Sequence, residues 1–191
     1  EKLTALWRMK QLEYTWLLSL MGKYQDFAAV TEQSLKYSCK ELGLKLGSKE
    51  RARLMAEYYH LSAYPEVKEV LNYLKGYQVM ILSNGSPSML AAAVGSAGIA
   101  GVVSRVISVD PLQKYKPAPE VYSLVLDGND MKPREIAFVS SNSFDIVGAV
   151  SFGFKGIWVN RRKNTLDELG FEPSLVLNDL SSLAENLKEF D

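Results

Sequence analysis

Three polar segments, each directly after a short apolar run, contain the residue types that could do chemistry in this sequence. The first is Ser83-Asn84-Gly85-Ser86-Pro87. Ser86 can cap a helix that begins at Pro87, so that hydroxyl, amide and backbone N–H groups converge on one anion-sized spot. Taken alone, the segment predicts an ordinary strand-to-helix turn as readily as an anion-binding site.

The second segment, Lys114-Tyr115-Lys116-Pro117-Ala118-Pro119, could present a fixed cation. Pro117 favours extended geometry at Lys116, and Pro119 favours the start of a helix that carries Tyr122. An ammonium group held in one direction could keep a carboxylate ionised and oriented. Two solvated surface lysines are the alternative interpretation, and by itself the segment favours it.

The third segment, from Phe138 to Asp145, also leads from an apolar run into a predicted helix. Two hydroxyls and an amide, those of Ser140, Ser141 and Asn142, could cap that helix, and the helix dipole favours the Asp145 carboxylate in its first turn. Capping alone would explain this composition. The order and spacing of the three segments, however, favour one shared site.

Alternating strands and helices would position these segments. Short apolar runs rich in β-branched residues predict five strands, within residues 77–84, 103–110, 135–141, 155–160 and 174–179. Helices are predicted at 65–75, 87–97 and 119–126, after residue 142 and from residue 180. Strands that are apolar on both faces indicate a parallel sheet covered by helices on each side, and such sheets bind ligands beyond the carboxyl ends of their strands.

The first 60 residues are helical in pattern, without a strand. Helices are predicted from residue 2 to Gly22, from Thr31 to Leu42, and from Ser48, a candidate N-cap, to His60. We therefore predict a helical cap subdomain at residues 1–63. A doubly wound, Rossmann-like α/β core would follow at residues 64–191.

Composition indicates a small-molecule partner. The 191 residues are 47% hydrophobic, and 22 basic residues balance 22 acidic ones, so no net field attracts nucleic acid or a membrane surface. Cys39 is predicted to be a small core residue, and His60 lacks neighbours at metal-ligand spacing, which disfavours zinc or a Ser-His-Asp triad. No basic leader and no apolar run of about 20 residues is present, which predicts a cytoplasmic location.

The three segments together resemble a known superfamily over nearly the whole chain. LSNG at 82–85, YKP at 115–117 and VSSNxFD at 139–145 resemble the second, third and fourth motifs of the haloacid dehalogenase (HAD) superfamily. LWRMKQLEYTW at 6–16 and FVSSNSFD at 138–145 are similar to the (S)-2-haloacid dehalogenases, also called L-2-haloacid dehalogenases. The resemblance implies hydrolytic release of halide from short 2-haloacids.

The fourth motif argues against a metal. Phosphatases of the superfamily bind magnesium through two acidic residues there, whereas this sequence has Ser141 at the first position and Asp145 as the only carboxylate. Magnesium prefers carboxylate oxygens, so the site is poorly furnished for it. Halide displacement requires no metal, and we expect no cofactor.

The resemblance places the nucleophile outside these residues. In the family it is an aspartate in a DxYGT-like motif on the first strand, and no such motif occurs here. We expect the parent protein to contain some tens of residues upstream, with a strand that fills the middle of the sheet. The aspartate would attack the carbon bearing the halogen, and water would hydrolyse the resulting ester, converting (S)-2-haloalkanoic acids to (R)-2-hydroxyalkanoic acids.

The resemblance also assigns roles around that nucleophile. Lys116 would keep it ionised, and Tyr122 would support Lys116 through its hydroxyl. Asp145, Ser140 and Asn142 would hold the lysine and the hydrolytic water.

The remaining assigned residues would bind the substrate. Ser83, with nearby backbone N–H groups, would bind the carboxylate, while Arg8, Asn84 and Phe144 would surround the departing halide. For Arg8 the alternative is an exposed helix arginine. This group is expected to share one cleft with Lys116.

Two apolar residues, Leu12 and Phe27, would line the pocket around the alkyl part of the substrate, although packing within the cap explains them equally well. Met9 stands where many relatives have glutamine. The alternatives are a magnesium-dependent HAD phosphatase acting on a small phosphate ester and a catalytically inactive HAD-like fragment. The apolar surplus of the first helix also predicts a homodimer, although a tightly packed cap would give the same pattern.

Overall fold

The computed structural model describes residues 1–128 and 130–188, which form two compact units. The first unit contains residues 1–62, 81–100 and 106–115, and the second contains 63–80, 101–105 and 116–191. The first unit therefore adds two later segments to the predicted cap. The cap boundary after residue 63 stays a prediction, and residues 189–191 of the predicted core lie outside the described residues.

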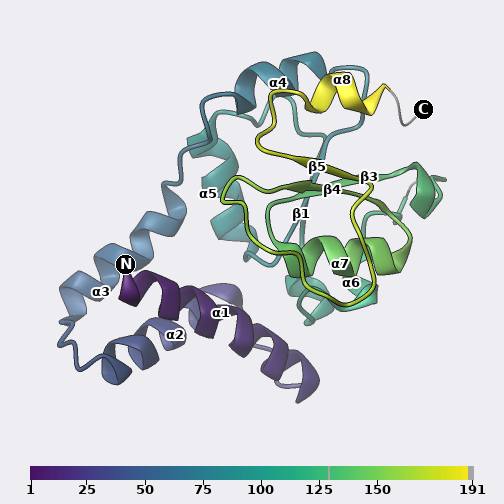
Figure 1. Ribbon diagram of the computed structural model, residues 1–191. Helices are drawn as coiled ribbons and strands as arrows, with labels where there is room; N and C mark the ends of the chain where they lie inside the picture. The colour runs from purple at the N-terminus through teal and green to yellow at the C-terminus, as the bar shows by residue number, and fades with distance from the viewer. Residues whose placement is uncertain (129, 189–191) are drawn as a thin grey trace. The chain divides into compact units, whose positions relative to one another are not determined.

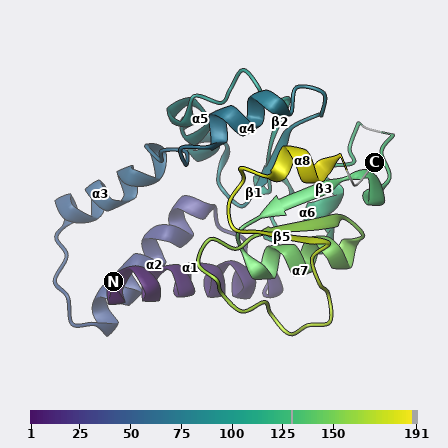
Figure 2. The same ribbon diagram turned by 45° about the horizontal axis from the view of Figure 1, so that its top comes forward.

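The first unit begins with helices (Figures 1 and 2). They are α1 (Lys2–Leu20), α2 (Phe27–Glu41) and α3 (Ser48–Ala56), followed by a 3-10 turn, η1 (Glu57–Tyr59). Helix α1 packs along α2. The prediction that the second helix begins at Thr31 is wrong, because the Asp26 carboxylate accepts the backbone N–H of Ala29 at 2.9 Å and starts the helix at Phe27. Ser48 was also misassigned, since Gly47 is the N-cap residue of α3.

Hydroxyl groups are buried where α1 and α2 pack. A cap hydroxyl row, formed by Thr31, Ser34 and Ser38 of α2, is fully buried. Each hydroxyl donates to a carbonyl oxygen one turn earlier, at 2.6 to 2.8 Å. The row is therefore neutral, each of its hydroxyl protons is donated within its own helix, and small side chains allow close packing of α1.

Two short strands, apart from the first residue of each, and a helix complete the first unit. Strands β1 (Met80–Ser83) and β2 (Arg105–Ser108) form a two-stranded sheet, and α5 (Pro87–Ala97) follows β1 with Ser86 as its N-cap residue. The carboxyl ends of both strands are joined, because Val109 N–H donates to the carbonyl oxygen of Ser83 at 3.1 Å. The hydroxyl of Ser108 donates to the carbonyl oxygen of Gly85 at 2.7 Å.

Tyr115 ends the last segment of the first unit, after the 3-10 turn η2 (Asp110–Leu112), and only 1% of it is exposed. Its backbone N–H donates to the hydroxyl of Ser19 at 3.0 Å, and its own hydroxyl donates to the carbonyl oxygen of Gln25 at 2.5 Å. Tyr115 is therefore fixed at both ends to α1 and to the turn that follows α1.

The second unit has a parallel three-stranded sheet, β3 (Ala137–Ser140), β4 (Lys155–Val159) and β5 (Leu175–Leu177). Helices α4 (Val67–Tyr73) and α8 (Leu183–Leu187) cover one face, and α7 (Ser143–Phe152) covers the other, with α6 (Pro119–Ser123) beside α7 (Figure 1). A 3-10 turn, η3 (Pro133–Glu135), precedes β3. Along β4 the faces alternate, since Gly156 approaches α7 and Ile157 joins the apolar cluster with α4 and α8.

All five predicted strands are present, so the α/β class with parallel strands and an N-terminal helical region is confirmed. Helices α4, α6 and α8 are shorter than predicted. Cys39 is a free, buried thiol, as expected of a small core residue. Within residues 1–128 and 130–188, no helix has the length and apolarity needed to cross a membrane.

Candidate active site

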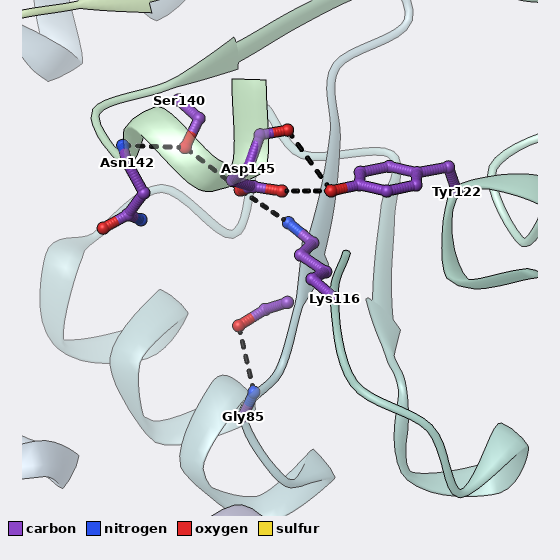
Figure 3. A network of polar contacts seen from close by, with 7 residues as sticks. Gly85, Lys116, Tyr122, Ser140, Asn142 and Asp145 are labelled. Atoms are coloured by element: carbon purple, nitrogen blue, oxygen red, sulfur yellow. Dashed lines mark hydrogen bonds and ion pairs between the residues drawn. The ribbon is translucent and has the colours of Figure 1, made fainter. Parts of the chain in front are cut away.

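A network of buried and half-buried polar side chains surrounds Asp145 in the second unit (Figure 3). The Lys116 ammonium lies 3.0 Å from Oδ2 of Asp145, and the Ser140 hydroxyl donates to the same oxygen at 3.0 Å. The Tyr122 hydroxyl donates to Oδ1 at 3.0 Å. Lys116 is 6% exposed and Asp145 4%, so opposite charges meet out of water. With Asn142, these residues are called the Asp145 network below.

The junction between β3 and α7 orients the carboxylate. Ser140 is the last residue of β3, and its hydroxyl accepts the backbone N–H of Asn142 at 3.2 Å while it donates to Asp145. Asn142 is the N-cap residue of α7, but its side chain makes no capping hydrogen bond. The Ser143 hydroxyl donates to Asp167 at 2.6 Å. The expectation that the Asn142 amide caps the helix is therefore wrong, and the Ser140 hydroxyl instead donates to the Asp145 carboxylate.

Tyr122 approaches Asp145 from α6 and is fully buried. Its ring packs against Phe138, Phe152 and Phe154, with centroid separations of 5.6, 6.0 and 6.1 Å. Burial raises the pKa of the Tyr122 hydroxyl, and the charge of Asp145 adds to this rise. Tyr122 therefore remains protonated and acts as a donor to the carboxylate.

The ammonium of Lys116 is under two opposing influences. Burial lowers its pKa from 10.5, and the attraction and hydrogen bond of Asp145 act in the other direction. The ring of Phe138, whose centroid lies 4.8 Å from Nζ, also favours the cation. A desolvated ammonium of this kind can hold a second anion, such as a carboxylate nucleophile, much more strongly than a solvated lysine can.

The donors around Asp145 do not suit magnesium. Oδ2 of Asp145 already accepts hydrogen bonds from Lys116 and Ser140, and Oδ1 accepts one from Tyr122. Magnesium requires carboxylate oxygens that are open to it, and Ser141 adds no second carboxylate. In the described part of the chain, no three His, Cys, Asp or Glu side chains cluster as potential metal ligands.

Within the second unit, the structure brings Lys116, Tyr122, Ser140, Asn142 and Asp145 together. The other predicted site residues lie on the following elements. Phe144 precedes Asp145 on α7, Arg8 and Leu12 lie on α1, and Phe27 begins α2. Phe27 is buried at 9% exposure.

Ser83 ends β1, and Asn84 follows it. The Ser83 hydroxyl accepts the backbone N–H of Gly85 at 3.1 Å, so this N–H is already engaged by the chain itself. Ser86, the expected cap of α5, makes no side-chain capping bond, and its hydroxyl instead lies 3.3 Å from that of Ser88.

One polar residue that sequence reasoning missed lies beside Arg8. Gln11 is fully buried, and its Oε1 accepts Nη1 of Arg8 at 2.8 Å. Its Nε2 donates to the hydroxyl of Thr31 at 2.7 Å and to that of Tyr58 at 3.3 Å. A glutamine three residues after an arginine, on the same face of the predicted helix, was the available signal.

Comparison with known proteins first defines the class. Residues 3–153 match the family described as haloacid dehalogenase-like hydrolase. The parallel sheet, the lysine after β2 and the aspartate in the first turn of α7 agree with that match.

More specific relatives define the family. The chain is 42% identical to an (S)-2-haloacid dehalogenase of Pseudomonas sp. (strain YL) over 186 residues, which cover 96% of this chain and 80% of the relative. The L-2-haloacid dehalogenase RSc1362 superposes with a TM-score of 0.95 at 40% identity, over 97% of this chain and 85% of that one.

A third relative is the L-2-haloacid dehalogenase from Xanthobacter autotrophicus with chloropropionic acid covalently bound. It superposes with a TM-score of 0.91 at 35% identity, over 97% of this chain and 85% of that one. The chain therefore belongs to the (S)-2-haloacid dehalogenase family of HAD hydrolases, which confirms the resemblance.

Proposed function

We propose that the protein hydrolyses the carbon–halogen bond of short (S)-2-haloalkanoic acids, which gives (R)-2-hydroxyalkanoic acids and halide. The buried Lys116–Asp145 pair is the observation that carries this proposal, because it provides a desolvated ammonium for an attacking carboxylate. The (S)-2-haloacid dehalogenases to which the chain is similar support the substrate class.

The reaction would proceed in two displacements. A carboxylate oxygen of an aspartate, which the family resemblance places on a strand outside these residues, attacks C2 and forms an ester bond. The carbon–halogen bond breaks and its electron pair leaves with the halide. Water then attacks the ester carbonyl carbon: one proton goes to the departing alcohol oxygen, the other is released, and the aspartate is regenerated. The hydroxy acid keeps the configuration that inversion at C2 gave it in the first displacement.

Lys116 keeps the nucleophile ionised during the first displacement and holds it in line with C2. Asp145 fixes Lys116 at 3.0 Å, and Tyr122 fixes Asp145 from the other oxygen. Ser140 and Asn142 orient the hydrolytic water, for which they provide hydroxyl and amide groups. Each residue of the Asp145 network thereby has a role in one of the two displacements.

The other predicted residues would bind the substrate. The Ser83 hydroxyl holds the substrate carboxylate, and Arg8, Asn84 and Phe144 receive the halide. A guanidinium, an amide N–H and an aromatic edge suit a large, weakly hydrated anion. Leu12 and Phe27 contact the alkyl group.

Assays of the full-length protein test this proposal. Halide release should occur with (S)-2-chloropropionate, remain absent with the (R) enantiomer and persist in EDTA. Turnover of a phosphate ester panel alone, and only with magnesium, would favour the phosphatase, while no turnover of any substrate would favour an inactive protein. Lys116→Ala should abolish halide release while the far-ultraviolet circular dichroism stays native.

The exposed apolar side chains of α1 support a homodimer. Leu20 is 85% exposed, Met21 59% and Leu17 43%. Apolar residues at this density on one helix favour burial against a second copy. Sedimentation velocity should show a dimer, and Leu17→Glu with Leu20→Glu should give a monomer; a wild-type monomer at all concentrations would contradict this.

A further inference from the structure

Gly148 lies beside the Asp145 network without forming any of its hydrogen bonds. It follows Asp145 by three residues on α7, so both residues lie on the same face of the helix. A Cβ at Gly148 would lie 2.4 Å from the Tyr122 hydroxyl oxygen and 2.7 Å from Cβ of Pro117. Atoms cannot approach so closely, so a side chain at this position would displace one neighbour or the other.

Neither neighbour can move without a change in the network. Tyr122 is fully buried between three phenylalanine rings, so its hydroxyl has no open direction in which to retreat. Pro117 is bonded to Lys116, so a shift of the proline ring moves the backbone that carries the ammonium. A methyl group at Gly148 would therefore shift Lys116 or Tyr122, the two residues outside the β3–α7 segment that donate hydrogen bonds to Asp145.

Helix conformation does not explain a glycine here. Gly148 is an interior residue of α7, where alanine is the better helix former. It is also buried. The absence of a side chain at Gly148 therefore provides space for Tyr122 and Pro117, and is not required by the backbone conformation.

We propose that Gly148 is a positioning residue for catalysis: its lack of a side chain lets Tyr122 and the Lys116-Pro117 segment approach α7 until both contact Asp145. This inference rests on the proposed function, in which Lys116 orients the nucleophile. Gly148 has no side chain with which to bind substrate, and in this proposal it acts only through Lys116 and Tyr122.

The test compares two glycine variants of the full-length protein. Gly148→Ala should lower kcat for (S)-2-chloropropionate by about 100-fold, as expected of a reacting group displaced by roughly 1 Å, while KM changes by less than about threefold. Gly156→Ala is the matched control, because its Cβ would lie 2.6 Å from Cγ2 of Val150 on the same helix. This equally close approach involves no residue of the Asp145 network, so kcat should stay within about threefold of wild type.

A double substitution separates positioning from general destabilisation. Tyr122→Phe removes the oxygen that the new methyl group would meet at 2.4 Å. Gly148→Ala should therefore lower kcat less in the Tyr122→Phe background than in the wild-type background, and the loss that remains there is expected from the contact with Cβ of Pro117 at 2.7 Å. An equal loss in both backgrounds, near-normal kcat for Gly148→Ala, or the same loss for Gly156→Ala would overturn the inference.

A crystal structure of Gly148→Ala tests the inference independently of the reaction. The Tyr122 hydroxyl should lie beyond 3.5 Å from Oδ1 of Asp145, or Lys116 Nζ beyond 4.0 Å from Oδ2. If both contacts persist, the inference is wrong even if the protein catalyses another reaction. Failure of the wild-type protein to release halide would instead overturn the proposed function alone.

Discussion

Two buried polar networks in this protein satisfy their hydrogen bonds in different ways. The cap hydroxyl row of Thr31, Ser34 and Ser38 is neutral, and each hydroxyl donates to a carbonyl oxygen of its own helix. The Asp145 network pairs opposite charges from residues that are 29 positions apart in the sequence. The row therefore forms with its helix, whereas the charged pair requires the assembled sheet and its helices.

This difference predicts different costs of disruption. A neutral buried hydrogen bond contributes about 0.5–1.5 kcal/mol, whereas removal of one partner of a buried ion pair costs about 3–5 kcal/mol. A stable core does not require such a pair, because well-packed apolar residues can replace it. The buried Lys116–Asp145 pair is thus better explained by a role in a reaction than by a contribution to stability.

The largest effect is expected for Asp145→Ala. Lys116 would remain buried without its counter-charge, so the free energy of unfolding should fall by about 3–5 kcal/mol at pH 7, measured by urea denaturation. Halide release should fall by a factor on the order of 1,000 or more, because the lysine is no longer oriented.

The double variant Lys116→Met with Asp145→Leu is the control for this first prediction. Stability should return to within about 1 kcal/mol of wild type while activity stays absent. A double variant as unstable as Asp145→Ala would show that the pair itself stabilises the fold.

The second effect concerns pH. Because burial lowers the pKa of Lys116 from 10.5, the ammonium should lose its proton below that pH. Above the midpoint, kcat/KM for (S)-2-chloropropionate should fall about tenfold per pH unit. Tyr122 does not compete in this range, because burial raises its pKa. A profile that stays flat up to pH 10.5 would contradict the requirement for a charged Lys116.

The lowered pKa of Lys116 also makes the stability of the fold depend on pH. Between the lowered pKa of Lys116 and 10.5, the unfolded chain binds more protons than the folded chain. This group therefore makes the free energy of unfolding rise with pH in that window, and Lys116→Met should remove the rise. Urea denaturation of both proteins across that range measures the difference.

A smaller effect is expected for Gln11→Leu in the cap. Arg8 loses the acceptor that holds its guanidinium at 2.8 Å, and Thr31 loses a donor. Stability should fall by about 1 kcal/mol, and turnover of 2-bromopropionate should fall by about tenfold if Arg8 receives the halide. Unchanged kcat and KM with this variant would remove Gln11 from any role in positioning Arg8.

The smallest effect is expected for Ser38→Ala in the cap hydroxyl row. Only a hydroxyl donated to the carbonyl oxygen of Ser34 is removed, and no buried partner loses its sole hydrogen bond. Stability should change by less than about 1 kcal/mol, and kcat should not change. A loss comparable to that of Asp145→Ala would erase the contrast between the two networks.

Sequence reasoning predicted the features that depend on local pattern. Each strand was found from its short apolar run, and the starts of α5 and α7 followed from Pro87 and from the polar residues after β3. The start of α2 was missed, because the predicted helix began at Thr31 and not at Phe27. In the structure Thr31 lies inside the helix, where its hydroxyl bonds the carbonyl oxygen of Phe27.

Features that depend on packing between distant segments escaped prediction. Gly148 carries no signal in its own helix, because its constraint comes from Pro117 and Tyr122. Gln11 likewise acquires its role only when α1 packs on α2. The spacing of the three motifs could bring Lys116 and Asp145 to one place, but not show that both are almost fully buried.

Tyr115 directly precedes Lys116, the lysine that we propose holds the nucleophile. Its amide and hydroxyl are tied to Ser19 and Gln25, and the next peptide belongs to Lys116. On the other side of the lysine, Pro117 abuts α7 at Gly148. The two residues that flank Lys116 are thus each held by contacts of their own. Shortening or lengthening of the 113–118 loop by even one residue would therefore displace the ammonium.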